Sequence, residues 1–287
     1  MRAIYKREIG SYAHSMIGYA VVAFFLLIAG LFFWAVNLDG GSPSVGGTMA
    51  NCMMIFILGL PVVTMRLLSD EQKQKTDQLL FSTPVSIWDV VLGKYFAAVT
   101  IFTIPFIAIC TMPMVLKLYG DIDFLSNYAM IFAFWVLGNV FLALGLLISS
   151  WTDNQIVALV VSILLYLAIY YLPSIVTLMP ETAMSSLIGF MIVVALLGLF
   201  VFIYVRNLIV TGLFVIIGEA ALLIIYAIKS TVFESLFLNF VINISLSTRF
   251  SEFLNMKFDI STLVYYVSCI ILFLYMTVQS VQKRRWS

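Results

Sequence analysis

The sequence predicts an all-α fold, a polytopic bundle of membrane-spanning helices with about eight spans. Hydrophobic residues make up 63% of the chain and charged residues only 10%, whereas about 25% of the residues in a soluble domain are charged. The mean hydropathy of +1.11 agrees. Apolar stretches of about twenty residues, the length that crosses some 30 Å of hydrocarbon, recur along the whole chain. We expect a single transmembrane domain over residues 1–287.

The chain opens with a short basic segment followed by an apolar run. Arg2, Lys6 and Arg7 precede the run at 17–36. This run is long enough to span the membrane and lacks the small-residue cleavage site of a signal peptide, so it predicts a retained first span. Residues 1–14 are expected to form an interfacial elbow helix, with apolar side chains on one side and basic ones on another.

Seven further apolar windows complete the set of predicted spans. With both termini in the cytoplasm, eleven of the fifteen basic residues fall on the cytoplasmic side, as the positive-inside rule favours. Residues 229–260 are expected to form one or two amphipathic helices on the outer side, and six spans plus a re-entrant hairpin is the alternative. The eight predicted spans are 17–36, 49–68, 95–117, 128–150, 155–177, 184–205, 208–228 and 261–281.

The longest polar stretch, residues 66–94, lies between the second and third spans and is the predicted cytoplasmic coupling segment. Ser69 and Gln72 have the spacing of a capping box, which predicts a helix starting at Ser69. Pro84 should end that helix near residue 82. A second box at Ser86 should start the helix of the next span. The alternative is a solvated loop.

Several classes of function lack their sequence signals. The chain has no GxxxxGK[ST] nucleotide loop, HExxH or GxSxG motif, which argues against an enzyme. Its three cysteines lie in separate apolar segments without metal-ligand spacing. The net charge of +1 is not that of a nucleic-acid-binding protein. We therefore expect no cofactor, metal or nucleic-acid partner.

Two polar residues fall inside predicted spans. Glu219 lies near the middle of the seventh span, where a carboxylate is costly unless it is paired, protonated or in contact with water. It is a candidate substrate or proton site, or alternatively a protonated structural residue. Asn139, in the fourth span, is a second candidate for the translocation path, although such a residue more often joins helices.

The coupling segment resembles that of permease subunits of ABC transporters of the type-2 exporter family, including gliding-motility-type permeases. The similar pattern is an acidic pair, a basic stretch, a threonine, two leucines, a proline and a Gly-Lys pair. Its residues are Asp70, Glu71, Lys73, Thr76, Leu79, Leu80, Pro84, Gly93 and Lys94. The end of the chain is also similar to this family, with an aromatic-rich outer segment at Arg249 and Phe250 leading to the basic tail.

The resemblance implies a transport subunit, an exporter in the cytoplasmic membrane. A separate ABC ATPase would bind the coupling helix through Asp70, Glu71, Lys73, Thr76, Leu79 and Leu80 and drive transport from there. It also implies a second permease copy or related permease, and in some systems an auxiliary membrane protein. The absence of a charged vestibule favours amphipathic cargo.

Two other functions fit the residues. A proton-coupled secondary transporter would use Glu219 as the proton carrier and would work without an ATPase. A membrane scaffold would bind a soluble partner through residues 66–94 without transporting anything.

Overall fold

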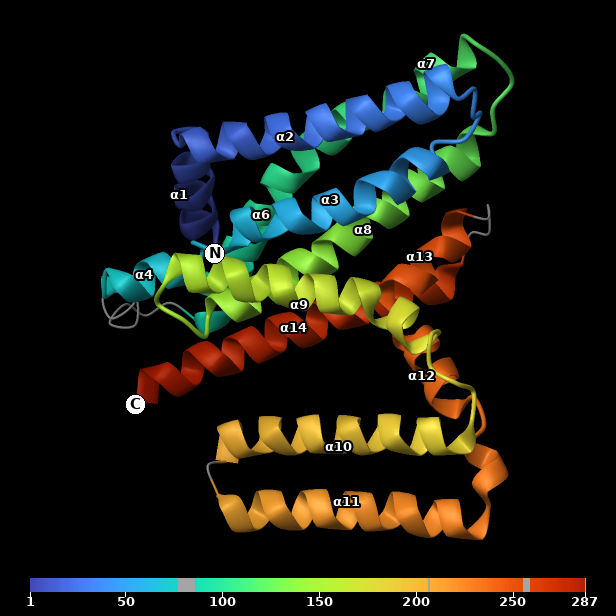
Figure 1. Cartoon of the computed structure of the whole chain (residues 1–287). Coiled ribbons are helices and arrows are strands. Elements are labelled where there is room, and N and C mark those ends of the chain that lie inside the picture. Colours follow the sequence, from blue (N-terminus) through green and yellow to red (C-terminus); the bar gives the residue numbers. More distant parts are fainter. Residues whose placement is uncertain (77–85, 206, 255–258, 287) are drawn as a thin grey trace. The chain divides into compact units, whose positions relative to one another are not determined.

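The computed structural model shown in Figure 1 describes residues 1–76, 86–205, 207–254 and 259–286, and these residues form helices joined by short turns. The chain divides into two compact units. Unit 1 contains Met1–Ala168 and Arg249–Ser287, and unit 2 contains Ile169–Thr248. An all-α polytopic fold is confirmed.

Unit 1 is a bundle of long apolar helices with short helices at its two ends. In chain order the elements are α1 (Arg2–Ala13), α2 (Met16–Phe32), the π-helix η1 (Phe33–Asp39), α3 (Gly46–Thr64), α4 (Ser69–Lys73), α6 (Ile87–Ile109), α7 (Met112–Lys117), α8 (Phe124–Ser149), α9 (Gln155–Val176), which continues into unit 2, α13 (Leu246–Leu254), which begins in unit 2, and α14 (Ile260–Trp286). The elbow helix expected at the N-terminus is α1, which lies crosswise to α2 (Figure 1).

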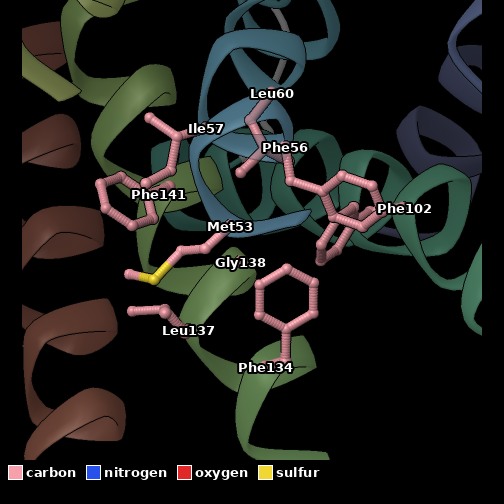
Figure 2. Close-up of a pocket in the computed structure, with 9 residues that line it drawn as sticks. All are labelled: Met53, Phe56, Ile57, Leu60, Phe102, Phe134, Leu137, Gly138 and Phe141. Atoms are coloured by element: carbon pink, nitrogen blue, oxygen red, sulfur yellow. The ribbon is translucent and has the colours of Figure 1, made fainter. Parts of the chain in front are cut away.

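Helix α8 forms the centre of unit 1 and packs against α3, α6 and α14. Aromatic rings pack between α3, α6 and α8: Phe134 lies 5.3 Å from Phe56 and 5.8 Å from Phe106, measured between ring centroids. Figure 2 shows side chains from α3, α6 and α8 turned toward one small cavity of about 10 Å³. This is room for at most one water molecule. Close-packed apolar side chains therefore occupy the centre of unit 1.

Gly138 makes the close packing of α8 against α6 feasible. A Cβ atom added at this residue would lie 2.3 Å from the ring of Phe102. That ring is itself buried and held between other aromatic side chains, so it has little room to move. Only glycine fits this contact without displacing the core.

Unit 2 contains a long helical hairpin and the short helices that follow it. Its elements are α10 (Ala183–Val205), α11 (Leu208–Ile228), the 3₁₀-helix η2 (Ser230–Phe233) and α12 (Leu236–Ile244), together with the end of α9 and the start of α13. Asn207 caps α11, since its side-chain oxygen accepts hydrogen bonds from the backbone amides of Ile209 and Val210. The rings of Phe190 and Phe237 lie 5.3 Å apart and join α10 to α12.

Seven helices among the described residues are long and apolar enough to cross a membrane. Helix α10 has 23 residues and matches the predicted span 184–205, although its apolar stretch counted over described residues is Ala183–Leu199. The bounds of the other predicted spans agree with the structure to within a few residues, except that α6 (Ile87–Ile109) begins and ends about eight residues before the predicted span 95–117, whose last residues form α7.

The predicted helix at 69–82 is wrong in two respects. Helix α4 ends at Lys73, and the positive φ of 56° at Lys75 breaks the helical path there. The Ser69–Gln72 capping box is absent because the Ser69 hydroxyl donates a hydrogen bond to the carbonyl oxygen of Met65 in the preceding turn. Residues 77–85, which include Leu79, Leu80 and Pro84, lie outside the described part of the chain.

Candidate functional site

The first part of the predicted coupling segment, with α4, lies at one end of unit 1 (Figure 1), where Glu71 of α4 pairs with Arg7 of α1 and Lys94 of α6. The described part of this segment before the gap, residues 66–76, follows α3 directly. Its side chains and backbone are bonded to four other helices. These bonds show which parts of the segment are fixed to the bundle and which are free to meet another molecule.

The backbone of residues 65–69 is joined to the end of α8 by one serine side chain. The Ser149 Oγ atom accepts hydrogen bonds of 3.2 Å from the amides of Leu68 and Ser69, and it donates one of 3.2 Å to the carbonyl of Met65. Ser149 and Ser69 are fully buried, so water does not compete for these bonds. A force applied to α4 would therefore pass directly to α8.

Two further hydrogen bonds join α4 to the region between α8 and α9. The Gln72 side chain donates to the carbonyl of Ser150 at 3.1 Å. Gln155, the first residue of α9, donates to the carboxylate of Asp70. Asp70 is thus engaged within the chain.

Four charged side chains from three helices form what we call the charge quartet: Arg7 and Glu8 of α1, Glu71 of α4, and Lys94 of α6. The Lys94 ammonium lies 3.1 Å from Glu8 and 3.0 Å from Glu71. Arg7 bonds to both carboxylates from the other side, at 2.8 Å to Glu8. Positive and negative groups alternate around the quartet. Its two cations and two anions give a formal charge of zero.

Lys94 is the most buried member of the quartet, since only 1% of its side chain is exposed. It donates hydrogen bonds to Glu8 at 3.1 Å and to the carbonyl of Leu67 at 2.5 Å, and it forms an ion pair with Glu71. A lysine ammonium has donors and no acceptor, and all three of these partners are oxygen atoms. A buried charge is tolerated only when it is paired and hydrogen-bonded in this way.

Helix α1 reaches the quartet because it packs closely against α6. At Gly93 an added Cβ atom would lie 3.2 Å from the Ile4 side chain, tighter than ordinary contact. Beyond the quartet, the buried Tyr12 hydroxyl donates to the carbonyl of Val63, and the Arg66 guanidinium lies 4.3 Å from the centre of the Tyr12 ring. The Gly93–Lys94 pair therefore combines a close helix contact with the central cation of the quartet.

The quartet shifts the ionisation of its groups. Burial by itself would raise the pKa of Glu8, but the charge of Lys94 and the hydrogen bonds from Arg7 and Lys94 outweigh it, so this pKa is lowered. Burial likewise opposes the charged form of Arg7, yet bonding to Glu8 and Glu71 raises the pKa of Arg7. Both groups are thus held in their charged forms.

The remaining predicted docking residues divide by exposure. Lys73 and Lys75 are exposed, and Lys73 makes no ion pair with a described residue. Thr76 donates a 3.4 Å hydrogen bond to the carbonyl of Glu71. The structure thus places Asp70 and Glu71 in contacts within the chain and leaves Lys73 available to a partner, while Leu79 and Leu80 lie outside the described residues.

Glu219 and Asn139, the two intramembrane candidates, belong to different units. Asn139 is buried in α8, where its amide donates to the carbonyl of Trp135 at 3.0 Å and its side-chain oxygen has no partner among the described residues. Glu219 is partly exposed in α11 and makes no hydrogen bond or ion pair with a described residue. The helix that packs against α11 is α10, and its residues 187–199 are all apolar or glycine, so this stretch has no polar side chain that could pair with Glu219.

A cavity of about 380 Å³ lies near the opposite end of unit 1, between the turn after η1 and the segment around α7. The buried Asn37 shapes its wall by donating hydrogen bonds of 2.8 Å to the carbonyls of Ser42 and Ser44. Other residues that line it are Leu38, Gly41, Pro43, Leu116, Tyr119, Gly120, Asp121 and Ile122.

Sequence reasoning missed Arg7, Glu8, Ser149 and Gln155 as parts of this site. Glu8 is the only acidic residue in α1, and Lys94 lies eight residues inside α6. An isolated acid in a basic helix and an isolated cation within an apolar helix were signals that could have suggested the pair.

Replacing Lys94 with methionine should destabilise the protein strongly. The change leaves Glu8 and Glu71 partly buried beside each other with only Arg7 to balance them, and breaking such buried pairs typically costs about 3–5 kcal/mol. Equilibrium unfolding in mixed micelles measures the effect. The control is Lys117→Met, which removes another paired lysine, but one that is 47% exposed. We expect no measurable change there, and equal losses in the two variants would contradict a special role for the quartet.

Acidification should release the contribution of Glu8 to stability. The folded-state pKa of Glu8 is below its ordinary value of 4.5. The ionised carboxylate therefore stabilises the folded state fully above pH 4.5, and this stabilisation is lost as the pH falls through the lowered pKa. The free energy of unfolding should therefore decrease below pH 4.5 by more in the wild type than in Glu8→Gln. Parallel pH curves for the two proteins would show that Glu8 is not held by the quartet.

Comparison with known proteins places this chain in a family. No match was found among curated proteins. The family described as "ABC-2 family transporter protein" matches residues 2–277, nearly the whole chain, including α1, α4, α6 and the long helices that could cross a membrane. The chain belongs to the ABC-2 transporter family and is an integral membrane permease of an ABC transporter.

Proposed function

We propose that this permease is the membrane subunit of an exporter, and that residues 66–76 form the inner, described part of the surface on which a separate ABC ATPase docks. The observation that carries this proposal is the two-sided construction of the segment. One side is bonded to α1, α6, α8 and the start of α9, and the other side exposes Lys73 and Lys75.

This construction suits the transmission of force. ATP-driven closure of a docked ATPase would push on the exposed side of α4. The hydrogen bonds of Ser149 would carry the load to α8, and the charge quartet would carry it to α1 and α6. Since α8 packs against α3, α6 and α14, movement of α4 would reorient the central helices of unit 1.

The proposed orientation puts α1, α4 and both termini in the cytoplasm, where ATP is available. The distribution of basic residues supports it. The opposite end of unit 1, with the 380 Å³ cavity of mixed polar and apolar lining, would then face outward.

A second permease copy or a related permease would complete the transport path. The centre of unit 1 is packed with aromatic side chains and contains a cavity of only about 10 Å³, so cargo would pass along the surface of the unit, between two subunits. This arrangement and the apolar faces of the spans favour amphipathic cargo. An auxiliary membrane protein remains part of the proposal.

Charge reversal at Lys73 should release the ATPase without unfolding the permease. We expect Lys73→Glu, purified from its native membrane with an affinity tag, to bring down on the order of ten-fold less ATPase activity than the wild type. The new carboxylate would repel the acidic groups of the ATPase that Lys73 attracts under this proposal. Lys117→Glu, at the opposite end of unit 1, is the control and should retain the ATPase.

Unfolding curves must accompany this measurement, since both variants are expected to remain as stable as the wild type. Asp70→Lys and Glu71→Lys are poorer probes because they would also break bonds within the chain. If wild type brings down no ATPase in mild detergent, or if Lys73→Glu retains all of it, docking on this segment is wrong.

The proton-coupled alternative depends on Glu219, whose carboxylate has no partner among the described residues. In that case transport in vesicles would respond to a pH gradient without ATP, and Glu219→Gln, which cannot release a proton, would abolish the response. Under the ATP-driven proposal, Glu219→Gln should leave the dependence on ATP intact. Val215→Gln, one helical turn away on α11, controls for adding an amide to the span.

A further inference from the structure

We propose that the outer side of α1 is a binding surface for the headgroups of anionic phospholipids, with Arg2 and Lys6 as the residues that bind them. By outer side we mean the α1 residues that are exposed in unit 1, namely Arg2, Ala3, Lys6, Arg7, Ser11 and Ala13. This proposal concerns a lipid partner and does not depend on the docking of an ATPase.

The inner side of α1 is fixed, which determines where its charges can point. Ile4 packs on Gly93, Glu8 binds Lys94, and the Tyr5 hydroxyl lies 3.0 Å from the hydroxyl of Thr100. These contacts all face α6. Because Glu8 is the only acid of α1 and is turned inward, the outer side carries basic residues and no acidic one.

Arg2 and Lys6 stand one helical turn apart, and neither makes an ion pair with a described residue. The nearby Asp89 carboxylate pairs with the N-terminal amine. Like charges spaced i,i+4 on a helix repel each other and destabilise it. A phosphate between them would turn this repulsion into two attractions, and long basic side chains can reach toward one while their stems cover apolar surface.

The position of α1 puts these side chains at the level of lipid headgroups. Helix α1 lies crosswise to α2 (Figure 1). A two-residue turn, His14 and Ser15, separates α1 from the first residue of α2, Met16. The side chains of Met16 and Tyr19 at the start of that span are 89% and 68% exposed, as expected where a helix meets lipid. A helix in the membrane plane at this depth has phosphates beside it.

We favour a lipid over an acidic protein as the partner of Arg2 and Lys6 for two reasons. Helix α1 lies at the depth of the lipid headgroups, and headgroup phosphates are always present there. Anionic lipids attract basic residues near the membrane surface with an energy that corresponds to about a five-fold change in affinity for each charge. Arg7, which follows Lys6 directly, is 54% exposed and belongs to the charge quartet. Lipid bound to α1 would therefore steady the helix that carries half of the quartet.

The test compares the full purified chain in nanodiscs of phosphatidylcholine alone and of phosphatidylcholine with phosphatidylglycerol. Hydrogen exchange of the α1 amides reports how firmly the helix is held. In the wild type we expect phosphatidylglycerol to slow this exchange about five-fold or more. The effect should shrink in Lys6→Gln and vanish in Arg2→Gln/Lys6→Gln.

Lys73→Gln/Lys75→Gln is the matched control, since it also removes two exposed cations near the same end of unit 1. It should keep the full response to phosphatidylglycerol. Equal loss of the response in both double variants, or no response in the wild type, would overturn the proposal. Protection by inorganic phosphate in phosphatidylcholine discs would also overturn it, because α1 would then bind a soluble anion.

Discussion

The buried ammonium of Lys94 is the constraint on which this end of the structure depends. With 1% of its side chain exposed, it must receive its partners from the protein. It does so by drawing together Glu8 from α1, Glu71 from α4 and the carbonyl of Leu67 from the turn after α3. These elements cannot separate from α6 without exposing or orphaning a charge. Gly93, the preceding residue, allows the close approach of α1 that this pairing requires.

The same constraint separates fixed surfaces from free ones. Glu71 and Asp70 are occupied within the chain, whereas Lys73 on α4 and Arg2 and Lys6 on α1 face outward. A partner protein on α4 and lipid beside α1 would therefore act on two helices that the charge quartet joins. Ser149 adds the connection to α8, the most buried helix of unit 1. If an ATPase docks on α4 as proposed, these contacts are the link that would carry its movement to the spans.

The spans could be predicted from the sequence because hydrophobic length directly reflects bilayer thickness. The N-terminal helix and the helix starting after Ser86 were also found where patterns indicated them, although the Ser86 side chain makes no capping hydrogen bond. The helix over 69–82 was not, because the Ser69 hydroxyl bonds back to Met65 and Lys75 takes a left-handed conformation. The Ser69 bond joins residues four apart and competes with the cap, and a capping pattern alone does not report which partner the hydroxyl takes.

The roles of individual charges were harder to predict for a similar reason. The resemblance indicated Asp70 and Glu71 as docking residues, and only the fold shows that Gln155 and Lys94 hold them. Those partners are far away in the sequence, and the pairing depends on a helix crossing. Glu219 remains a prediction, since its carboxylate has no partner among the described residues.

The most direct measurement is the distance between α1 and α4 during the ATP cycle. Spin labels at Ser11 and Gln74, both exposed, would report it in the permease purified with its ATPase, with Cys52, Cys110 and Cys269 replaced and Lys73 kept. A second pair at Gln74 and Leu118 would span unit 1. Our account predicts that a non-hydrolysable ATP analogue changes the second distance and leaves the first unchanged. Separation of α1 from α4, with the second distance constant, would contradict it.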